Sequence, residues 1–508
     1  MEPSRPRVTL RSFSREPYAS AIAAARSCYA PRVIEPSEVT AAQRDSVGPL
    51  TYGAGHHTVY QHAHFEFGLE NVSRHFVWSF LHSHPFYNSE QSSQRYVKQK
   101  QVAAFAPPLE GDVAGIYETA IAASWDSYFR LIEILRPVAR EKLCALYHVR
   151  PTSLASRSQR MDRFSEKRAM EIARYVLPIA AFTSMVHTIS GITLFRLVRL
   201  RNSGDTPMET AMVIDEMVRC VREIDPDFFA KVGDAPVARD DLPETPFTAA
   251  RPASTEQRRR IDAELAGRSS RLVSCDPGAP HLLADAGRLV LGENGLSDDR
   301  ILELMLNPAL NIYRRETLDL GFHSPLLRPL HHVQYTFLKK ISHTADSQDQ
   351  RHRMVPASRP MLLANDSADP DFITPMLIDE CDAARHEYTK AMRSAWDAKA
   401  KLLEAGLPLE LAQYVLPNAL ALRFYESGSL MYLLHKWTLR TCLNAQEEIF
   451  RASMEELEQV RAVHPAIARY IGPFCVLRNG ITSPRCPEGD HFCGVPVWRD
   501  FPNIRRTI

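Results

Sequence analysis

The feature that most constrains this chain is an internal repeat of long period. Three short segments occur twice in the same order: HAHFEF at 62–67 and HVQYTF at 332–337, YVLP at 175–178 and 414–417, and Leu200-Arg201 and Leu439-Arg440. A strand–turn–helix pattern over Val8–Tyr29 also returns from Val273. The period of about 240 to 270 residues is far longer than that of a solenoid repeat. The repeat therefore indicates two duplicated domains.

Length and composition agree with two domains. The chain has 508 residues, more than the roughly 250–300 at which a single core stops growing. The polar, proline-containing stretch from Asp240 to Arg260 has the composition of a linker. We therefore expect copy one over residues 1–245 and copy two over 260–508. A net charge of +1, from 61 basic and 60 acidic residues, argues against a polyanion-binding surface.

Several features predict a cytoplasmic protein. The first residues lack the apolar segment of a secretory signal, and no apolar run reaches the roughly 18–20 residues of a membrane span. Nine cysteines, mostly scattered, fit a reducing compartment. Cys475, Cys486 and Cys493 in the C-terminal tail are 11 and then 7 positions apart, which is not a CxxC pattern. We therefore expect free thiols there and no metal.

Periodicity predicts an α+β fold in each copy, rich in helices and with a small antiparallel sheet. The segments at 62–67 and 332–337 alternate as strands do. Residues 208–222 and 445–463 have the spacing of amphipathic helices, and a further helix is expected to start near Thr255. Because strands are few and do not alternate with helices as in repeated βαβ units, a parallel sheet is not expected.

The two copies retain different parts of one motif set. Copy one has Ser93-Gln94-Arg95-Tyr96 and Arg174 before YVLP, whereas copy two has VPASRP and Gln413 at these places. Copy two has Gln348, the triplet Arg351-His352-Arg353, and LR followed by AQEEI. At the matching positions copy one has Ser79, His82-Ser-His and an LR pair without AQEEI.

Both copies resemble the flavin-dependent thymidylate synthase family over most of their length, and the tail from Gly472 resembles that of some members. The resemblance implies conversion of dUMP to dTMP, with FAD as cofactor and NADPH and methylenetetrahydrofolate as co-substrates. It implies no nucleic-acid polymer and no membrane as partner. The reduced flavin supplies the hydride in this family, so the protein has to supply mainly binding and electrostatics.

The resemblance also assigns roles to residues. The substrate-binding residues it implies are Gln91, Ser93, Gln94, Arg95, Arg174, Gln348 and Arg351. Hydroxyl and guanidinium donors suit a phosphate dianion. Arg440 matches the catalytic arginine beside the uracil ring, where it stabilises the anionic ring. The cofactor contacts it implies are His332, Thr336, Arg351, His352, Arg353 and His435.

The losses in the two copies are complementary. In the family one subunit supplies the Ser-X-Arg loop and its partner supplies the glutamine, the RHR triplet and the LR arginine. Copy one retains the first set and copy two the second, which favours one composite site shared by the copies. The protein would then be a homodimer of double-domain chains. Whether the site forms within or between chains stays open, as do a related flavoenzyme with another pyrimidine substrate and a non-catalytic nucleotide-binding protein.

Overall fold

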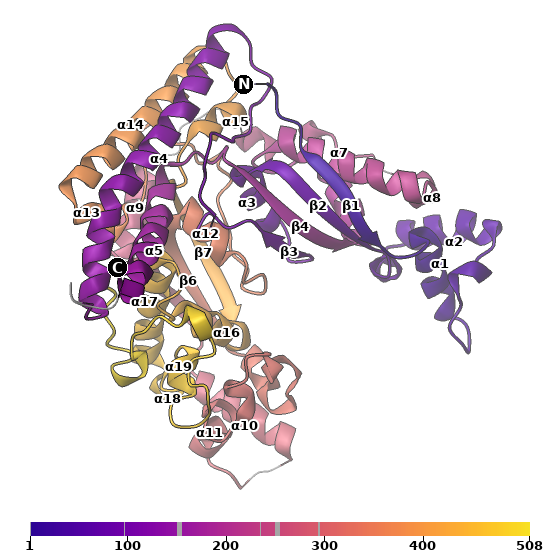
Figure 1. Cartoon of the computed structure of the whole chain (residues 1–508). Coiled ribbons are helices and arrows are strands. Elements are labelled where there is room, and N and C mark those ends of the chain that lie inside the picture. The colour runs from indigo at the N-terminus through magenta and orange to yellow at the C-terminus, as the bar shows by residue number, and fades with distance from the viewer. Residues whose placement is uncertain (1, 96, 150–154, 234, 249–254, 293–294) are drawn as a thin grey trace.

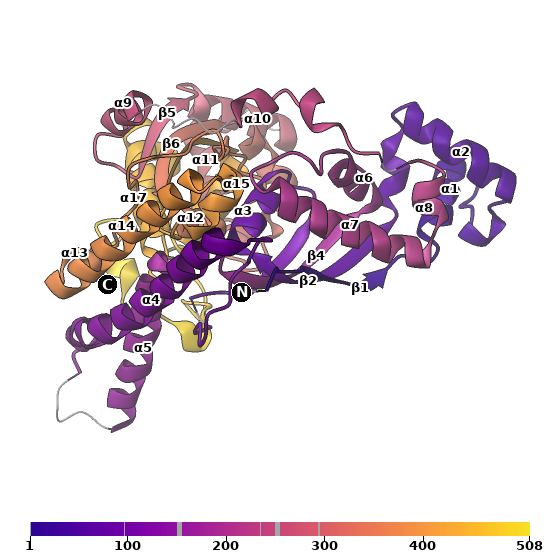
Figure 2. The same ribbon diagram turned by 90° about the horizontal axis from the view of Figure 1, so that it is seen from above.

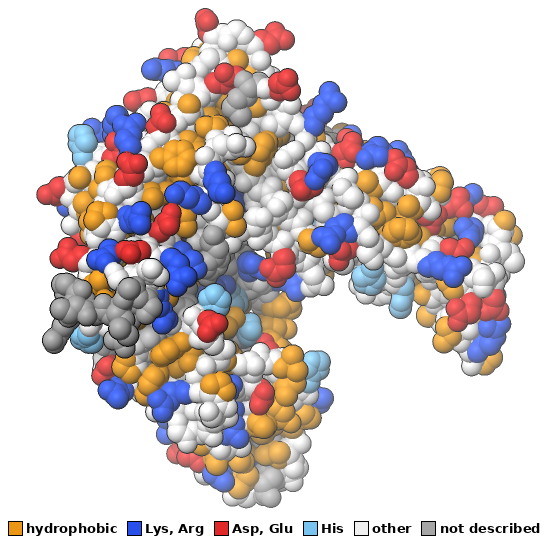
Figure 3. Space-filling view, viewed as in Figure 1, with side chains coloured by type: hydrophobic (Ala, Val, Ile, Leu, Met, Phe, Trp, Pro, Cys, Tyr) orange, Lys and Arg blue, Asp and Glu red, His pale blue; other side chains and the backbone are white. Residues whose placement is uncertain are grey.

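The computed structural model describes residues 2–95, 97–149, 155–233, 235–248, 255–292 and 295–508. Copy one and copy two form two lobes that meet at α4 (Gly111–Leu146) and α14 (Asp382–Glu404) and then diverge (Figures 1 and 2). A broad recess lies between the lobes (Figure 3). None of the helices in these ranges has the length and apolar content needed to cross a membrane.

Copy one contains a four-stranded antiparallel sheet in the order β1-β2-β4-β3. Its strands are β1 (Arg7–Phe13), β2 (His64–Ser73), β3 (Asn88–Gln91) and β4 (Phe182–Ser190). Phe65 and Phe67 of β2 are fully buried and pair with Ile189 and His187 of β4. The other helices of copy one are α1 (Pro17–Ser27), α2 (Ala41–Gly53), α3 (Arg74–His82), α5 (Ala155–Ala173), α6 (Gly191–Arg199), α7 (Pro207–Ile224) and α8 (Asp227–Ala230).

Copy two contains a three-stranded antiparallel sheet in the order β5-β6-β7. Its strands are β5 (Ser270–Cys275), β6 (Gln334–Ser342) and β7 (Ala421–Ser429), and β6 pairs with β7 from Gln334↔Ser429 to Ser342↔Ala421. Its other helices are α9 (Thr255–Leu265), α10 (Ala279–Leu291), α11 (Asp298–Leu306), α12 (His343–Asp349), α13 (Met376–Asp379), α15 (Leu409–Ala412), α16 (Leu430–Arg440), α17 (Glu447–Val463), α18 (Pro465–Ala468) and α19 (Phe474–Leu477). The predicted α+β class with two tandem copies is confirmed.

The predicted helices form with small shifts at their ends. The helix expected over 208–222 is α7, and the helix expected near Thr255 is α9. The helix expected from residue 445 begins at Glu447, because the Gln446 side chain accepts a hydrogen bond from the Ile449 amide and caps it. The chain between Arg440 and Glu447 is a loop that lies beside the candidate site.

The two YVLP segments cross at the interface and make reciprocal contacts. The Ile179 amide donates to the Leu416 carbonyl at 2.8 Å, and the Asn418 amide donates to the Leu177 carbonyl at 2.8 Å. Such reciprocity is the property of a twofold interface, here formed within one chain. One such interface generates two candidate sites, one on each side of the crossing.

Side chains extend this reciprocity. The Tyr414 hydroxyl donates to Glu209, which also accepts from the amide of Ser73. On the other side, the Tyr175 hydroxyl donates to Glu448, which also accepts from the amide of Ser342. Each copy therefore anchors the YVLP tyrosine of the other, which fixes the register of the interface.

Candidate functional site

A cavity of about 60 Å³ lies where copy one faces α12 of copy two. Its lining residues are Arg74, Gln91, Ser92, Ser93, Gln94, Arg95 and Arg174 from copy one, and Thr344, Ser347, Gln348, Arg351 and Asn418 from copy two. A second cavity, of about 340 Å³, is lined by β3, β4 and two arginines of copy two. The cavities share Gln91 and Arg351, so they adjoin. All seven predicted substrate-binding residues line the first cavity.

Arg95 is held by an ion pair and by a loop of copy two. Its Nε lies 2.7 Å from Glu171, and its Nη2 donates to the Asn444 carbonyl at 2.8 Å. Arg168 pairs with the other Glu171 oxygen at 2.6 Å. Burial by itself would raise the pKa of Glu171, but the guanidinium groups of Arg95 and Arg168 lower it to about 2. The carboxylate therefore stays ionised and orients Arg95.

The same wall of the cavity contains buried hydrogen-bond donors with no partner in the described part of the chain. These atoms are Arg74 Nε, Arg174 Nη2 and Gln94 Nε2. Burial and the neighbouring Arg174 lower the pKa of Arg74 to about 9. Two buried cations side by side are unfavourable unless an anion compensates them. This wall therefore has the donor set of an anion site.

Arg440, at the end of α16, contacts Gln348, which lines the cavity from copy two. Its Nε donates to His352 Nε2 at 2.9 Å, and its Nη2 donates to the Gln348 carbonyl at 3.3 Å. Burial and then Arg440 lower the pKa of His352 well below its usual range. A neutral His352 that accepts at Nε2 carries its proton on Nδ1. The Gln348 side-chain oxygen is buried and lacks a partner within the described ranges, so it is available to a ligand.

Arg351 and Arg353 lie at the second cavity against β3 of copy one. Arg351 pairs with Glu90 at 2.5 Å. Arg353 donates to the Asn88 side chain at 3.2 Å and lies over the Tyr87 ring, 5.1 Å from its centroid. Both guanidinium groups thus face a cavity large enough for part of a flat ligand.

The remaining predicted cofactor residues lie outside the two cavities. His435 pairs with Asp319 at 2.8 Å, and its ring lies 5.6 Å from that of His352. Thr336 shares a hydrogen bond of 2.8 Å with Ser427 on the sheet. His332 is exposed just before β6. Tyr96, the last residue of the Ser-X-Arg-Tyr motif, lies outside the described residues.

A buried charge network that the sequence did not predict supports the Arg440 side. Lys339 and Lys436 contact Asp349 at 2.6 and 3.0 Å, and both also contact Glu426. Asp349 also interacts electrostatically with Arg440 and His352. Lys339 further pairs with Glu456 at 3.5 Å. The network therefore forms a rigid polar base beneath the catalytic candidate.

At the reciprocal interface, side chains occupy the space between α3 and the VPASRP segment, and a cavity of about 210 Å³ that includes Ser358 and Gln413 is lined by copy two alone. Arg359, in the VPASRP segment, makes two hydrogen bonds to Asp346 at 2.7 and 2.8 Å, and Trp78 Nε1 donates to the same carboxylate at 2.7 Å. Gln413 donates to the Leu362 carbonyl at 2.9 Å and to Asp366 at 3.2 Å.

Five lining residues were not predicted from the sequence: Arg74, Ser92, Thr344, Ser347 and Asn418. Arg74 follows Ser73 in a repeated segment, and copy two has His343 at the equivalent position, so a position-by-position comparison of the copies could have found it. Asn418 donates to Gln94 at 3.3 Å and to the Arg174 carbonyl at 3.0 Å. Thr344 and Ser347 are small polar residues whose type alone carries no functional signal.

The cysteines of the C-terminal tail interact electrostatically with one another and with Cys442. Across the described ranges no three His, Cys, Asp or Glu side chains are grouped so that they could hold a metal ion. All nine cysteines are free thiols. Burial raises the pKa of Cys442 and Cys475 to about 12, so both stay protonated near neutral pH.

Comparison with known proteins gives a consistent result. The family model described as thymidylate synthase complementing protein matches residues 9–227 and 271–466. The flavin-dependent thymidylate synthase of Geobacter sulfurreducens is 30% identical over 226 residues, which are 44% of this chain and 92% of that protein. The enzyme of Sulfurisphaera tokodaii is 30% identical over 41% of this chain and 79% of its own length. That of Clostridium tetani is 28% identical over 44% of this chain and 92% of its own length. Each relative thus matches less than half of the chain.

Proposed function

The chain belongs to the flavin-dependent thymidylate synthase family, and we propose that it converts dUMP to dTMP at one composite site between its two copies. The observation that supports this most is the set of buried donors without partners among the described residues on the copy-one side, with Gln348 lining the other side and Arg440 in contact with it. A phosphate wall and a base wall facing each other are what a pyrimidine nucleotide requires.

The phosphate of dUMP would bind on the copy-one wall. Ser93, Gln94, Arg95 and Arg174 supply hydroxyl, amide and guanidinium donors, Gln91 lies beside them, and Arg74 adds a buried cation. Charge-assisted hydrogen bonds to a dianion are about twice as strong as neutral ones. The two negative charges would compensate the paired guanidinium groups, so binding relieves an unfavourable arrangement.

The uracil ring would bind on the copy-two wall. Gln348 presents its unpartnered amide oxygen to the ring N–H. Arg440, fixed by His352 and by the Gln348 carbonyl, would stabilise negative charge that develops on the ring oxygen during transfer. The hydrogen bonds from Nε to His352 and from Nη2 to the Gln348 carbonyl fix the plane of the Arg440 guanidinium.

Flavin would bind in the adjoining cavity. Arg353 provides positive charge there, which fits an anionic reduced flavin. Arg351 lines the same cavity in an ion pair with Glu90, and His352 contacts Arg440. The family's Asn-X-Arg contact is replaced by Ser429-Leu-Met431, in which the Ser429 hydroxyl is buried and has no partner among the described residues. When bound, the reduced flavin supplies the hydride. His332, Thr336 and His435 would act only at the edge of this site.

The co-substrates and assembly belong to the same proposal. NADPH would reduce the flavin, and methylenetetrahydrofolate would donate the carbon. We further propose a cytoplasmic homodimer of double-domain chains, with copy one over 1–245 and copy two over 260–508. Each chain would hold one nucleotide, because the second interface is filled by Arg359 and Trp78.

Purified protein tests the proposal directly. We expect yellow protein that retains FAD, oxidises NADPH faster when dUMP is added, and forms dTMP only with methylenetetrahydrofolate present. Yellow protein that is indifferent to dUMP would point to a flavoenzyme with another substrate. Colourless protein that takes up no FAD would point to a non-catalytic nucleotide-binding protein.

A further inference from the structure

The C-terminal tail returns from copy two to the phosphate side of the composite site. The Tyr147 hydroxyl of copy one donates to the Cys493 carbonyl, and the final residue, Ile508, is buried in the core that also contains residues of α4 and α5. Figure 1 places the C-terminus beside α5. The tail is therefore packed against both copies and does not end in solvent.

Arg506 is the tail residue that contacts the site-bearing loop. Its Nη1 donates to the Ala445 carbonyl at 2.8 Å, and its Nε donates to the Ile508 carbonyl at 2.9 Å. The guanidinium also lies over the Phe450 ring, 5.6 Å from the centroid. Its Nη2 is buried. These contacts fix both the tail end and the carbonyl of Ala445.

The neighbouring residue in that loop, Asn444, contacts the phosphate wall. Its carbonyl accepts from Arg95 Nη2 at 2.8 Å, and its side chain donates to the His491 carbonyl of the tail at 2.7 Å. The tail thus holds residues 444–445 at two points, and this loop in turn holds Arg95. Arg506 also interacts electrostatically with Glu171, the ion-pair partner of Arg95.

We propose that Arg506 is a positioning residue for phosphate binding: it fixes the 444–445 loop so that Asn444 and Glu171 hold Arg95 in the geometry that the nucleotide requires. This inference rests on the proposed function. Copy one ends in the inter-copy linker and has no counterpart of the tail, so the contact between Arg506 and the 444–445 loop serves only the composite site. Loss of the Arg506 side chain would weaken the binding of a phosphorylated ligand more than it would slow the chemical step.

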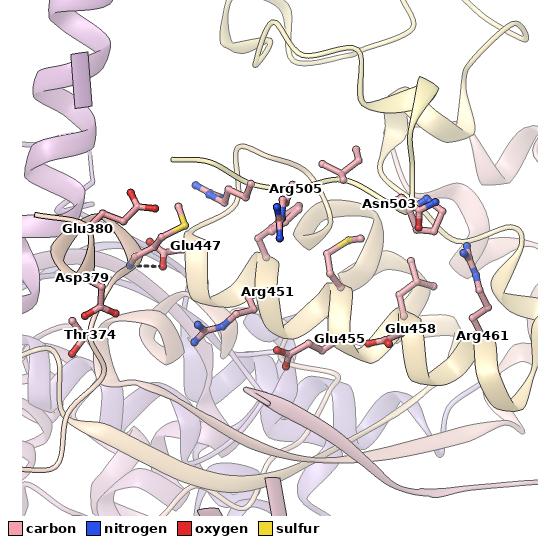
Figure 4. A pocket seen from close by; sticks show the side chains of 17 residues that line it. Thr374, Asp379, Glu380, Glu447, Arg451, Glu455, Glu458, Arg461, Asn503 and Arg505 are labelled. Carbon is pink, nitrogen blue, oxygen red and sulfur yellow. Dashed lines mark hydrogen bonds between the residues drawn. The ribbon is translucent and has the colours of Figure 1, made fainter. Parts of the chain in front are cut away.

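The adjacent residue, Arg505, provides a matched control. It is exposed and lines a cavity of about 650 Å³ between α17 and the tail (Figure 4). It has the same charge as Arg506 and lines the same cavity, but its side chain is exposed.

The test compares full-length Arg506→Met, Arg506→Lys and Arg505→Met proteins loaded with FAD. For Arg506→Met we expect the KM and the Kd for dUMP to rise about tenfold, as for one lost charge-assisted contact. We expect kcat within twofold of the wild type and an unchanged Kd for deoxyuridine, which lacks the phosphate. Arg506→Lys keeps the charge and one donor and should recover part of the affinity, and Arg505→Met should match the wild type.

Three outcomes would overturn the inference: equal KM values in Arg506→Met and Arg505→Met, a loss confined to kcat, or equal weakening of dUMP and deoxyuridine. If Arg506→Met is too unstable to purify, Arg506→Lys tests the inference instead. A lysine cannot reproduce the two guanidinium hydrogen bonds to Ala445 and Ile508, so wild-type affinity for dUMP in that variant would contradict the positioning role. Wild-type protein that binds dUMP but forms no dTMP contradicts the proposed function alone, and the binding comparison still tests Arg506.

Discussion

At the composite cavity α12 presents Thr344, Ser347 and Gln348, whereas at the reciprocal interface α3 places His75, Trp78 and Ser79 at the equivalent positions. The Trp78 and His82 rings lie 4.3 Å apart and occupy that space. The backbone hydrogen bonds between the two YVLP segments are reciprocal, and side-chain volume separates the cavity at one interface from the occupied space at the other. A duplicated gene can thus close one of two equivalent sites without changing the fold.

The two interfaces also differ in whether their buried arginines are paired with carboxylates. In the composite cavity Arg74 and Arg174 have buried nitrogens without partners in the described part of the chain. At the reciprocal interface Arg359 is neutralised by Asp346, and Gln413 replaces the second arginine. An interface whose cations are all compensated has no use for a phosphate, and one with excess cations requires an anion.

The supports of the two LR arginines differ as well. The charged network beneath Arg440 is formed by Lys339, Asp349, Glu426, Lys436 and Glu456, and the equivalent positions in copy one are Leu69, Phe80, His187, Leu197 and Met217. With an apolar base beneath it, Arg201 turns outward and pairs with Asp215 on α7. The LR arginine that we propose to be catalytic is thus the one with buried charged residues beneath it.

The largest expected effect is that of substituting the two LR arginines, Arg440 and Arg201. Arg440→Ala should lower kcat for dTMP formation by roughly 10²–10³-fold, the usual loss when a preorganised donor to a developing anion is removed. Arg201→Ala should stay within about twofold of the wild type, because its surface ion pair contributes at most about 1 kcal/mol. Steady-state kinetics at saturating dUMP measure both. Equal losses in the two variants would contradict the composite site.

A smaller effect is expected from exchanging the residues before the YVLP motifs. Arg174→Gln, which places the copy-two residue in copy one, should raise the Kd for dUMP by roughly 30-fold, since a buried charge-assisted contact is worth about 2 kcal/mol. The reverse change, Gln413→Arg, should leave the stoichiometry at one dUMP per chain, because Arg359 and Trp78 fill the second interface. Isothermal titration calorimetry gives both numbers. Two nucleotides per chain in either the wild type or Gln413→Arg would show that the second interface opens.

The sequence could predict the site better than it could predict the side chains that support it. The motifs and their complementary losses indicated which copy supplies Arg95 and which supplies Arg351, because ligand chemistry restricts residue type at such positions. The filling of the second interface could not be predicted, since Trp78 and Arg359 act through their packing and not through a motif. The charge network was missed for the same reason: Lys339 and Glu426 meet only when β6 pairs with β7 and α16 packs on them.

The smallest expected effect concerns the interface between the copies and is a change in the pH dependence of the free energy of unfolding. Burial raises the pKa of Glu209, the acceptor of Tyr414, to about 7, despite the hydrogen bonds from Ser73 and Tyr414 that lower it. An unfolded glutamate titrates near pH 4.3. Between these values the folded chain keeps a proton that the unfolded chain releases, so the free energy of unfolding falls as pH rises from about 4.5 to 7.

Glu209→Gln removes this titration and keeps the shape of the side chain. Urea unfolding at pH 5, 6 and 7 should therefore show a decline that is shallower by up to about 1 kcal/mol per pH unit than in the wild type. Glu216→Gln, an exposed change on the same helix, should keep the wild-type slope. The Glu209→Gln variant should retain part of the decline through Asp205, whose pKa burial also raises to about 7. An unchanged slope in Glu209→Gln would mean that Glu209 is ionised in the folded chain, so that the Tyr414 anchor holds a buried charge.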